Sequence, residues 1–183
     1  LEFRRVLFRS ADDLAVLPDD GHRYELVDST LIVTPAPSWR HQRAVVRLVT
    51  TLAAALPDDL EVLAAPFDVR LADDTVLQPD VLVCRIADLT LRDLPAPPVL
   101  AVEVLSPSTR LVDLNLKRAR FEAAGCPAYW VVDPDVPSIT AFFTHSRVGG
   151  NQCVIRSKTT SYFLGAWRSN GSIVTRSTSN RSR

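Results

Sequence analysis

The stretch VLAVEVL at residues 99–105 decides the fold, because it combines an apolar strand pattern with a single acidic residue, Glu103. A nearly continuous apolar run is typical of a central strand that is buried on both faces. Side chains alternate along a strand, so Glu103 shares a face with Leu105, whereas Val102 and Val104 point the other way. An ionised carboxylate in such a strand is costly unless it is paired or metal-bound. The sequence therefore predicts a buried polar site at Glu103.

A second carboxylate, Asp80, lies in another apolar run, QPDVLV at residues 78–83. If this strand is the neighbour of the Glu103 strand, both carboxylates can reach one cation. Hard oxygen ligands of this kind select Mg²⁺ or Mn²⁺. We expect the backbone carbonyl of Val104 to add a third protein ligand.

Lys117 supplies a basic group close to these acids. It falls at helical spacing with Leu114, Phe121 and Ala124, which places it on the apolar stripe of the helix and toward the sheet. Lysine is rare in this chain, since only Lys117 and Lys158 stand among its 21 basic residues. A compact ammonium that is buried in this way suits positioning a water or stabilising charge at a reacting phosphate.

The surrounding sequence predicts an ordered series of helices and strands. Two short β-rich runs, 23–27 and 31–33, form a hairpin, and Ser38 caps a helix over 39–56. Strands are expected over 61–71, 76–84 and 99–105, followed by a second helix that stops at Gly125. A strand over 129–132 and an edge strand over 140–143 complete the series.

Length and composition favour one domain in a reducing compartment. A chain of 183 residues accommodates a single domain of ordinary size. No segment approaches the roughly 20 consecutive apolar residues of a membrane span, so a membrane protein is not expected. The three cysteines form no Cys-x-x-Cys pair, and free thiols in the cytoplasm fit them best.

The charge is divided unevenly along the chain. Residues 1–145 hold 14 basic and 21 acidic residues, which is 14 − 21 = −7, whereas residues 146–183 hold seven basic and no acidic residues. The absence of methionine indicates a fragment or foreign ends. We therefore expect a foreign N-terminal extension over 1–19, a domain over 20–145, and a Ser/Thr-rich basic tail over 146–183 that is disordered or foreign.

The ordered series of motifs resembles the PD-(D/E)XK nuclease superfamily, and more closely its Uma-two family of endonucleases. The matching stretches are YELVD at 24–28, SWRHQ at 38–42, PDV at 79–81, EVLSPST at 103–109, DLNLK at 113–117 and GCPAYWVVDP at 125–134. The resemblance implies an α/β fold with a mixed sheet, a restriction-endonuclease-like core of a helix, three strands, a helix and a strand, after an N-terminal β-hairpin. It also implies that Asp80 and Glu103 bind the metal.

The catalytic lysine departs from the superfamily's usual position. There it stands two residues after the glutamate, which is Leu105 here. The Uma-two family draws its lysine from the following helix, and Lys117 fits that substitution. A second departure is Ser29, where glycine is usual after Asp28, and it is expected to strain the hairpin turn.

Two further residues are weaker candidates for the site. The resemblance places Glu25 near it, although glutamates in hairpins are usually solvated. His41 opens the first helix, where a DNA-contacting or water-positioning role competes with a surface or packing role.

The leading functional hypothesis is a Mg²⁺-dependent endodeoxyribonuclease in which Asp80 and Glu103 bind the metal and Lys117 positions water or stabilises the transition state. DNA is the expected partner, and a homodimer is plausible for a nuclease of this fold. The alternative is an inactive nuclease-fold module for nucleic-acid binding or partner docking. The charge of −7 over residues 1–145 weakens the case for DNA as the partner, because it offers few positive charges to bind phosphates. A carboxylate-pair glycosidase is disfavoured by the lysine and by the lack of an aromatic sugar platform.

Overall fold

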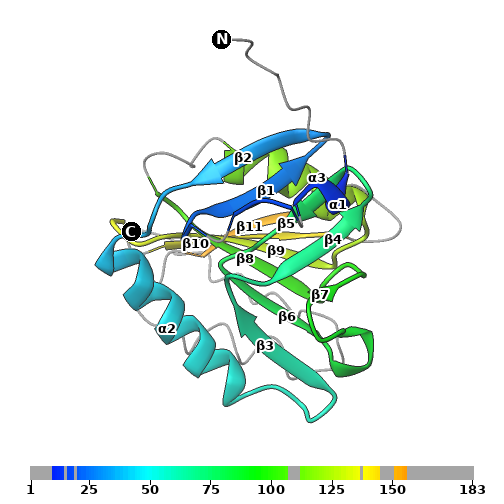
Figure 1. Ribbon diagram of the computed structural model, residues 1–183. Coiled ribbons are helices and arrows are strands. Elements are labelled where there is room, and N and C mark those ends of the chain that lie inside the picture. Colours follow the sequence, from blue (N-terminus) through cyan, green and yellow to red (C-terminus); the bar gives the residue numbers. More distant parts are fainter. Residues whose placement is uncertain are drawn as a thin grey trace, which may run out of the picture.

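The computed structural model describes residues 10–14, 16–18, 20–106, 112–136, 138–144 and 151–155, with side chains omitted at 112–114 and 151–155. The described strands form two sheets, and the chain crosses between these sheets several times (Figure 1). The six-stranded sheet has the order β11 (Asn151–Ile155), β10 (Ser138–Phe143), β9 (Ala128–Asp133), β8 (Leu100–Val104), β6 (Val81–Arg85) and β3 (Leu60–Ala64). The five-stranded sheet has the order β2 (Thr30–Thr34), β1 (Arg23–Val27), β5 (Thr75–Leu77), β4 (Asp68–Ala72) and β7 (Asp93–Leu94).

Strand β8 is central in the larger sheet, as its apolar sequence predicts. It pairs antiparallel with β6 and parallel with β9, and all five of its residues are buried. Val102 and Val104 belong to the hydrophobic cluster on one face, whereas Ala101 and Leu105 belong to the cluster on the other. The predicted alternation of faces is therefore confirmed.

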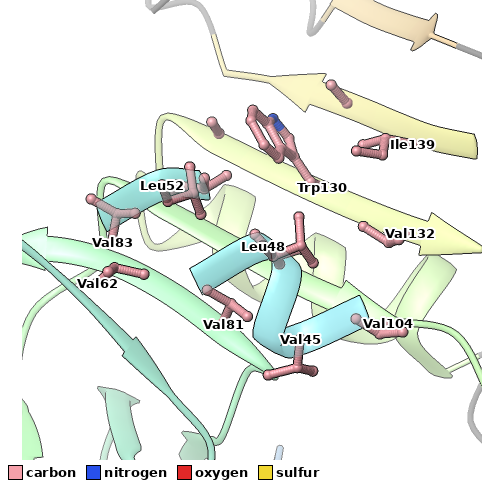
Figure 2. Close-up of a cluster of buried hydrophobic side chains, with 14 residues drawn as sticks. Val45, Leu48, Leu52, Val62, Val81, Val83, Val104, Trp130, Val132 and Ile139 are labelled. Carbon is pink, nitrogen blue, oxygen red and sulfur yellow. The ribbon is translucent and has the colours of Figure 1, made fainter. Parts of the chain in front are cut away.

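Helix α2 (Trp39–Ala53) covers one face of the six-stranded sheet, on the side away from β1 and β2 (Figure 1). Ser38 is its N-cap and accepts a hydrogen bond from the backbone N–H of His41, at 3.4 Å. Val45, Leu48 and Leu52 lie on one helical stripe and pack on the valines of the sheet and on Trp130 (Figure 2). This apolar contact anchors the helix that also carries His41.

A second hydrophobic cluster fills the space between the two sheets. It joins Val27 and Leu77 of the smaller sheet to Leu82 and Ala101 of the larger one. The remaining cover comes from α3 (Arg118–Ala123), whose Phe121 is fully buried against this cluster. The π-helical turn η2 (Val112–Lys117) leads directly into α3. The polar site lies at the end of this inter-sheet layer.

Two of the predicted strands are each divided between the two sheets. The predicted strand over 61–71 is β3 and β4, and the predicted strand over 76–84 is β5 and β6. Pro66 and Pro79 stand at the two divisions. Proline has no N–H to donate to a ladder, so each proline ends one strand and lets the chain change sheets. The fold class is as predicted, and the strands are arranged in two sheets.

The described fold extends beyond both expected domain boundaries. At the N-terminal side, α1 (Ala11–Leu14) packs near the β4–β5 turn, where the Ala11 N–H donates to the carbonyl of Asp73 at 2.8 Å. At the other end, β11 pairs with β10 across residues 151–155, so β10 is not the edge strand that was predicted. Residues 1–9 and 156–183 lie outside the described residues, and the foreign or disordered nature of those ends stays a prediction.

Two further expectations concern cysteines and membrane spans. Cys84 and Cys126 are buried free thiols, and burial raises the pKa of each to about 11. Within the described ranges, the helices are too short or too polar to cross a bilayer.

The β1–β2 hairpin turn places a serine in the left-handed region. Asp28 and Ser29 have φ angles of 49° and 61°, and a two-residue type I′ hairpin turn requires positive φ at both positions. Glycine adopts such angles without steric cost, whereas a residue with a Cβ does not. The hairpin turn also contacts the β4–β5 turn, since the Ser29 N–H donates to the carbonyl of Asp74 at 3.0 Å.

Replacing Ser29 by glycine is expected to stabilise the protein. Ser29→Gly relieves the strain of the positive φ angle. Its free energy of unfolding should exceed that of Ser29→Ala, which also lacks the hydroxyl, by about 1 kcal/mol. Urea denaturation of the two variants measures the difference. Equal stability of the glycine and alanine variants would show that the turn carries no strain.

Candidate active site

The pairing of β6 with β8 brings Asp80 next to Glu103. Val81 pairs with Val102 and Leu82 with Ala101. Continuing this antiparallel register by one residue places Asp80 opposite Glu103. Cross-strand neighbours of this kind have Cβ atoms about 5 Å apart and point to the same face. Both carboxylates therefore lie on the inter-sheet face, and Asp80 and Glu103 are 3% and 1% exposed.

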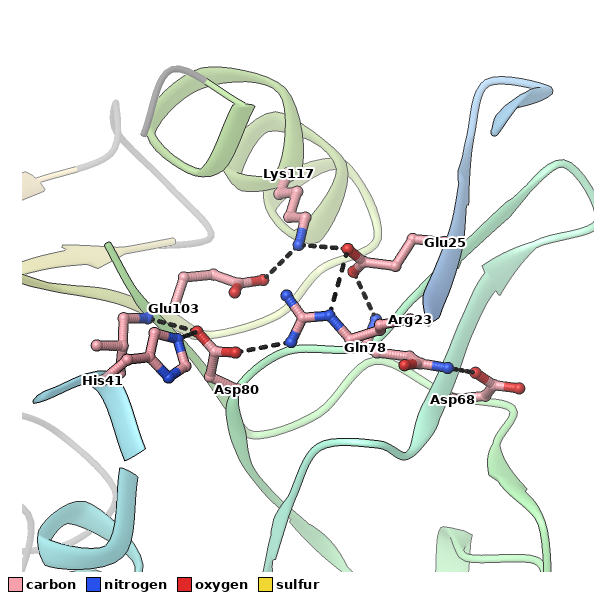
Figure 3. A network of polar contacts seen from close by, with 9 residues as sticks. Arg23, Glu25, His41, Asp68, Gln78, Asp80, Glu103 and Lys117 are labelled. Carbon is pink, nitrogen blue, oxygen red and sulfur yellow. Dashed lines mark hydrogen bonds and ion pairs between the residues drawn. The ribbon is translucent and has the colours of Figure 1, made fainter. Parts of the chain in front are cut away.

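A third carboxylate comes from the other sheet. Glu25 on β1 is fully buried and points toward Asp80 and Glu103 (Figure 3). Its Oε1 accepts a hydrogen bond from the backbone N–H of Gln78 at 2.8 Å. The Gln78 side chain in turn donates to Asp68 at 2.7 Å, which ties this part of the site to β4.

Lys117 joins the acids of the two sheets. Its Nζ lies 2.8 Å from Oε2 of Glu25 and 3.2 Å from Oε1 of Glu103 (Figure 3). The lysine is only 1% exposed, and it arrives from the last position of the η2 turn. Leu105, two residues after Glu103, packs in the hydrophobic cluster. The ammonium of Lys117 thus enters the site from the helix side, as the sequence predicts.

Asp80 is held by three donors from different elements. Its Oδ1 accepts from Nη1 of Arg23 at 2.7 Å, and its Oδ2 accepts from Nε2 of His41 at 3.0 Å and from the backbone N–H of Val104 at 2.8 Å. Burial by itself raises the pKa of this carboxyl, but the His41 hydrogen bond and the Arg23 charge outweigh it and lower the pKa to about 2. Asp80 is therefore ionised at neutral pH.

Arg23 completes the charge balance on the β1 side. Its Nε lies 3.9 Å from Oε2 of Glu25, in addition to the contact with Asp80. Burial by itself lowers the pKa of Arg23, but the negative charges of Glu25, Asp80 and Glu103 outweigh it and hold that pKa above its usual value. Arg23 and Lys117 supply two positive charges against three carboxylates, which leaves 2 − 3 = −1 when His41 is neutral.

His41 presents its second ring nitrogen without a partner. Because the ionised Asp80 is an acceptor, His41 donates to it from Nε2. The Nδ1 atom is buried and has no hydrogen-bond partner among the described residues. The sequence prediction placed this residue only weakly in the site, whereas the structure brings it into direct contact with Asp80.

A cleft of about 910 Å³ opens beside one side of this network. Arg23, His41 and Asp80 line it, together with the polar side chain of Gln78. Glu25, Glu103 and Lys117 lie behind those residues, toward the inter-sheet core. Arg23, His41 and Asp80 are therefore the members of the network that face the cleft.

The donor set is suited to a hard divalent cation. Asp80 and Glu103 offer carboxylate oxygens at adjacent positions, and the surplus negative charge favours a cation. The described residues contain no preformed group of three or more His, Cys, Asp or Glu ligands for a metal. Mg²⁺ is commonly bound through one or two carboxylates with water completing the shell, so two adjacent carboxylates fit it.

The structure gathers all five predicted side chains, Glu25, His41, Asp80, Glu103 and Lys117, into one network. At Val104 the structure shows a hydrogen bond from the backbone N–H to Asp80. Metal binding by the Val104 carbonyl stays a prediction. Arg23 was missed. Arg23 shares a strand face with Glu25 and the buried Val27, but this spacing alone does not distinguish it from a solvated arginine at the start of a hairpin strand.

The fold is that of restriction-endonuclease-like proteins. The chain belongs to the Uma2 family, whose model, described as "Putative restriction endonuclease", matches residues 11–159. No match was found among curated proteins.

A solved structure supports the fold. The crystal structure of "a putative nuclease belonging to DUF820" from Anabaena variabilis ATCC 29413 is similar to this chain with a TM-score of 0.67. The similarity covers 81% of this chain and 84% of that one at 15% identity. At this identity the likeness establishes the fold alone, and together the family and the fold support a nuclease.

The low pKa of Asp80 predicts a defined acid sensitivity. Its ordinary pKa of 3.8 falls to about 2 in the folded protein. Ionised Asp80 therefore stabilises the fold above pH 3.8, and this stabilisation, equivalent to about 2 kcal/mol, is lost as the pH falls toward 2. Urea unfolding of the wild type and Asp80→Asn between about pH 5 and pH 2 should show their stability difference shrinking by that amount.

The matched control is Asp58→Asn, which alters an exposed carboxyl far from the network. Its stability difference from the wild type should stay nearly constant over the same range. A constant difference for Asp80→Asn as well would contradict the charged hydrogen-bonded pairing of Asp80.

Proposed function

We propose that this protein is a Mg²⁺-dependent endonuclease that hydrolyses phosphodiester bonds in DNA. The observation that carries the proposal is the position of Lys117, whose Nζ lies 3.2 Å from Glu103 although the lysine comes from a separate helical segment. A buried lysine placed between two carboxylates is costly to maintain for stability alone. Its placement beside adjacent acidic residues supports a hydrolytic role.

Asp80 and Glu103 would hold Mg²⁺, or Mn²⁺ in its place, with the Val104 carbonyl as a further ligand. When bound, such a metal lowers the pKa of a water and neutralises charge on the phosphoryl oxygens. The low pKa of Asp80 keeps this ligand ionised and ready to bind a cation at neutral pH.

Lys117 would orient the attacking water or stabilise the negative charge that develops on the phosphate. Glu25 contacts the same ammonium at 2.8 Å and is fully buried, so it fixes the position of the lysine. This makes Glu25 a positioning residue for Lys117.

Arg23 and His41 would act from the cleft side. A guanidinium presents a planar fork that suits a phosphate, and Arg23 lines the cleft next to Asp80. His41 holds Asp80 through Nε2, so it is a positioning residue for the metal ligand, and its Nδ1 could hold a water. A homodimeric state, DNA as the substrate in place of RNA, and a cytoplasmic location belong to the same proposal.

Removing the lysine is the direct test of this function. Plasmid nicking in MgCl₂ should fall by about 100-fold or more in Lys117→Met and in Glu103→Gln, because each change removes a charge needed at the reacting phosphate. Glu122→Gln is the matched control, since Glu122 is exposed on the adjoining α3 helix. Thermal unfolding of each variant checks that it is folded.

Two results would contradict the assignment. Nicking that persists in folded Lys117→Met or Glu103→Gln would remove these residues from the mechanism. Wild-type protein that binds DNA but takes up neither Mg²⁺ nor Mn²⁺ in calorimetry would favour the inactive binding module.

Arg23 should oppose the binding of a cation, because it already occupies Oδ1 of Asp80. Arg23→Gln is expected to tighten Mn²⁺ binding by about tenfold. This is a modest part of the interaction energy of roughly 4 kcal/mol between unit charges about 4 Å apart near a surface. Nicking should nevertheless fall, since the phosphate loses its guanidinium. Arg70→Gln, a change at a partly exposed arginine of the same cleft, should leave Mn²⁺ affinity unchanged. Weaker Mn²⁺ binding in Arg23→Gln would show that Arg23 only organises Asp80.

A further inference from the structure

The first residue of α2 is an exposed tryptophan at the edge of the cleft. Trp39 is 65% exposed, although tryptophan is usually well buried. Its neighbours in the chain, Ser38, Arg40 and His41, all line the cleft. Trp39 itself does not line the cleft, and its indole lies on the exposed side of the helix start, where packing in the core does not account for it.

Two arginines lie over the indole ring. The Cζ atom of Arg43 is 4.9 Å from the ring centre, and that of Arg40 is 5.5 Å away. Arg40 also donates to the exposed Asp135 at 3.0 Å. Stacked guanidinium and indole groups form a flat surface with positive charge around it.

The charge of α2 contrasts with the charge of the domain. The helix carries Arg40, Arg43 and Arg47 and contains no acidic residue, whereas residues 1–145 have a net charge of −7. A locally positive helix at the cleft is complementary to a polyanion. This favours nucleic acid over a protein partner as the ligand of Trp39.

The helix also fixes the distance between this surface and the reacting groups. Trp39 precedes His41 by two residues, which is about 3 Å along the helix axis and about 200° around it, so the indole is exposed on one side of the helix and the imidazole is buried on the other. His41 is bonded to Asp80, and the next turns of α2 are anchored in the core. A base held on Trp39 would thus be held in a defined position relative to Asp80.

We propose that Trp39, with Arg40 and Arg43, is a stacking platform for an unpaired nucleobase, and that the protein therefore prefers single-stranded or locally unpaired DNA. This substrate class rests on the proposed nuclease function. Every base offers a flat face to an aromatic side chain, but in a duplex those faces are covered by neighbouring base pairs. The arginines would pair with the flanking phosphates.

The test measures binding without cleavage, by fluorescence anisotropy in EDTA. The probes are a labelled oligo-dT of about 15 nucleotides and a duplex of the same length. Trp39→Ala should weaken oligo-dT binding by about tenfold and change duplex binding by less than about twofold, because only the single strand stacks. Trp39→Phe should restore most of the affinity. Val46→Ala, at an exposed apolar residue of the same helix, should change neither affinity.

Three outcomes would overturn the proposal. They are equal oligo-dT affinity in the wild type and Trp39→Ala, an equal loss for both probes, and no binding of either probe by the wild type, which would point to a protein partner. Failure of the nuclease function is seen separately. In that case Mg²⁺ gives no nicking by the wild type, while the selective loss of oligo-dT binding in Trp39→Ala persists in EDTA and supports the platform.

Discussion

The structure depends on the compensation of one buried charge, the carboxylate of Glu103 in the middle of the larger sheet. A carboxylate that is 1% exposed must be paired or neutralised, or the fold pays several kcal/mol. Lys117 pairs with it from the η2 turn, and Glu25 shares that lysine from the other sheet. The same pairing therefore ties together the helix, the larger sheet and the smaller sheet. A site made in this way is rigid, because each charged group is held by partners from different elements.

The change of sheet at Pro79 explains why the acids meet. The residue before this proline, Gln78, donates its backbone N–H to Glu25 of the smaller sheet. The residue after it, Asp80, directly precedes Val81, which pairs with Val102, the neighbour of Glu103 in the larger sheet. Because proline ends β5 without continuing its ladder, three residues of chain bridge the two layers. The position of Asp80 is thus a consequence of the backbone as much as of its charge.

Sequence reasoning found the residues whose environment contradicts their polarity. Asp80, Glu103 and Lys117 are ionisable groups on apolar patterns, and that contradiction is visible without a structure. Arg23 could not be found in this way, because an arginine at the start of a hairpin strand is ordinarily solvated. Its partner Asp80 is 57 residues away, and no local pattern reports that contact. The division of two predicted strands between sheets was missed for a related reason, since strand periodicity alone does not report which ladder a strand joins.

The central claim is that Asp80 and Glu103 bind one divalent cation beside Lys117. The most direct measurement is a crystal structure of the protein soaked in MnCl₂, with the metal located by its anomalous scattering. The account predicts one manganese peak bonded to oxygen atoms of both Asp80 and Glu103, with Arg23 displaced from Asp80 and Nζ of Lys117 still next to Glu103. Manganese bound elsewhere, or the Arg23–Asp80 pair intact with no peak between the two carboxylates at saturating MnCl₂, would contradict it.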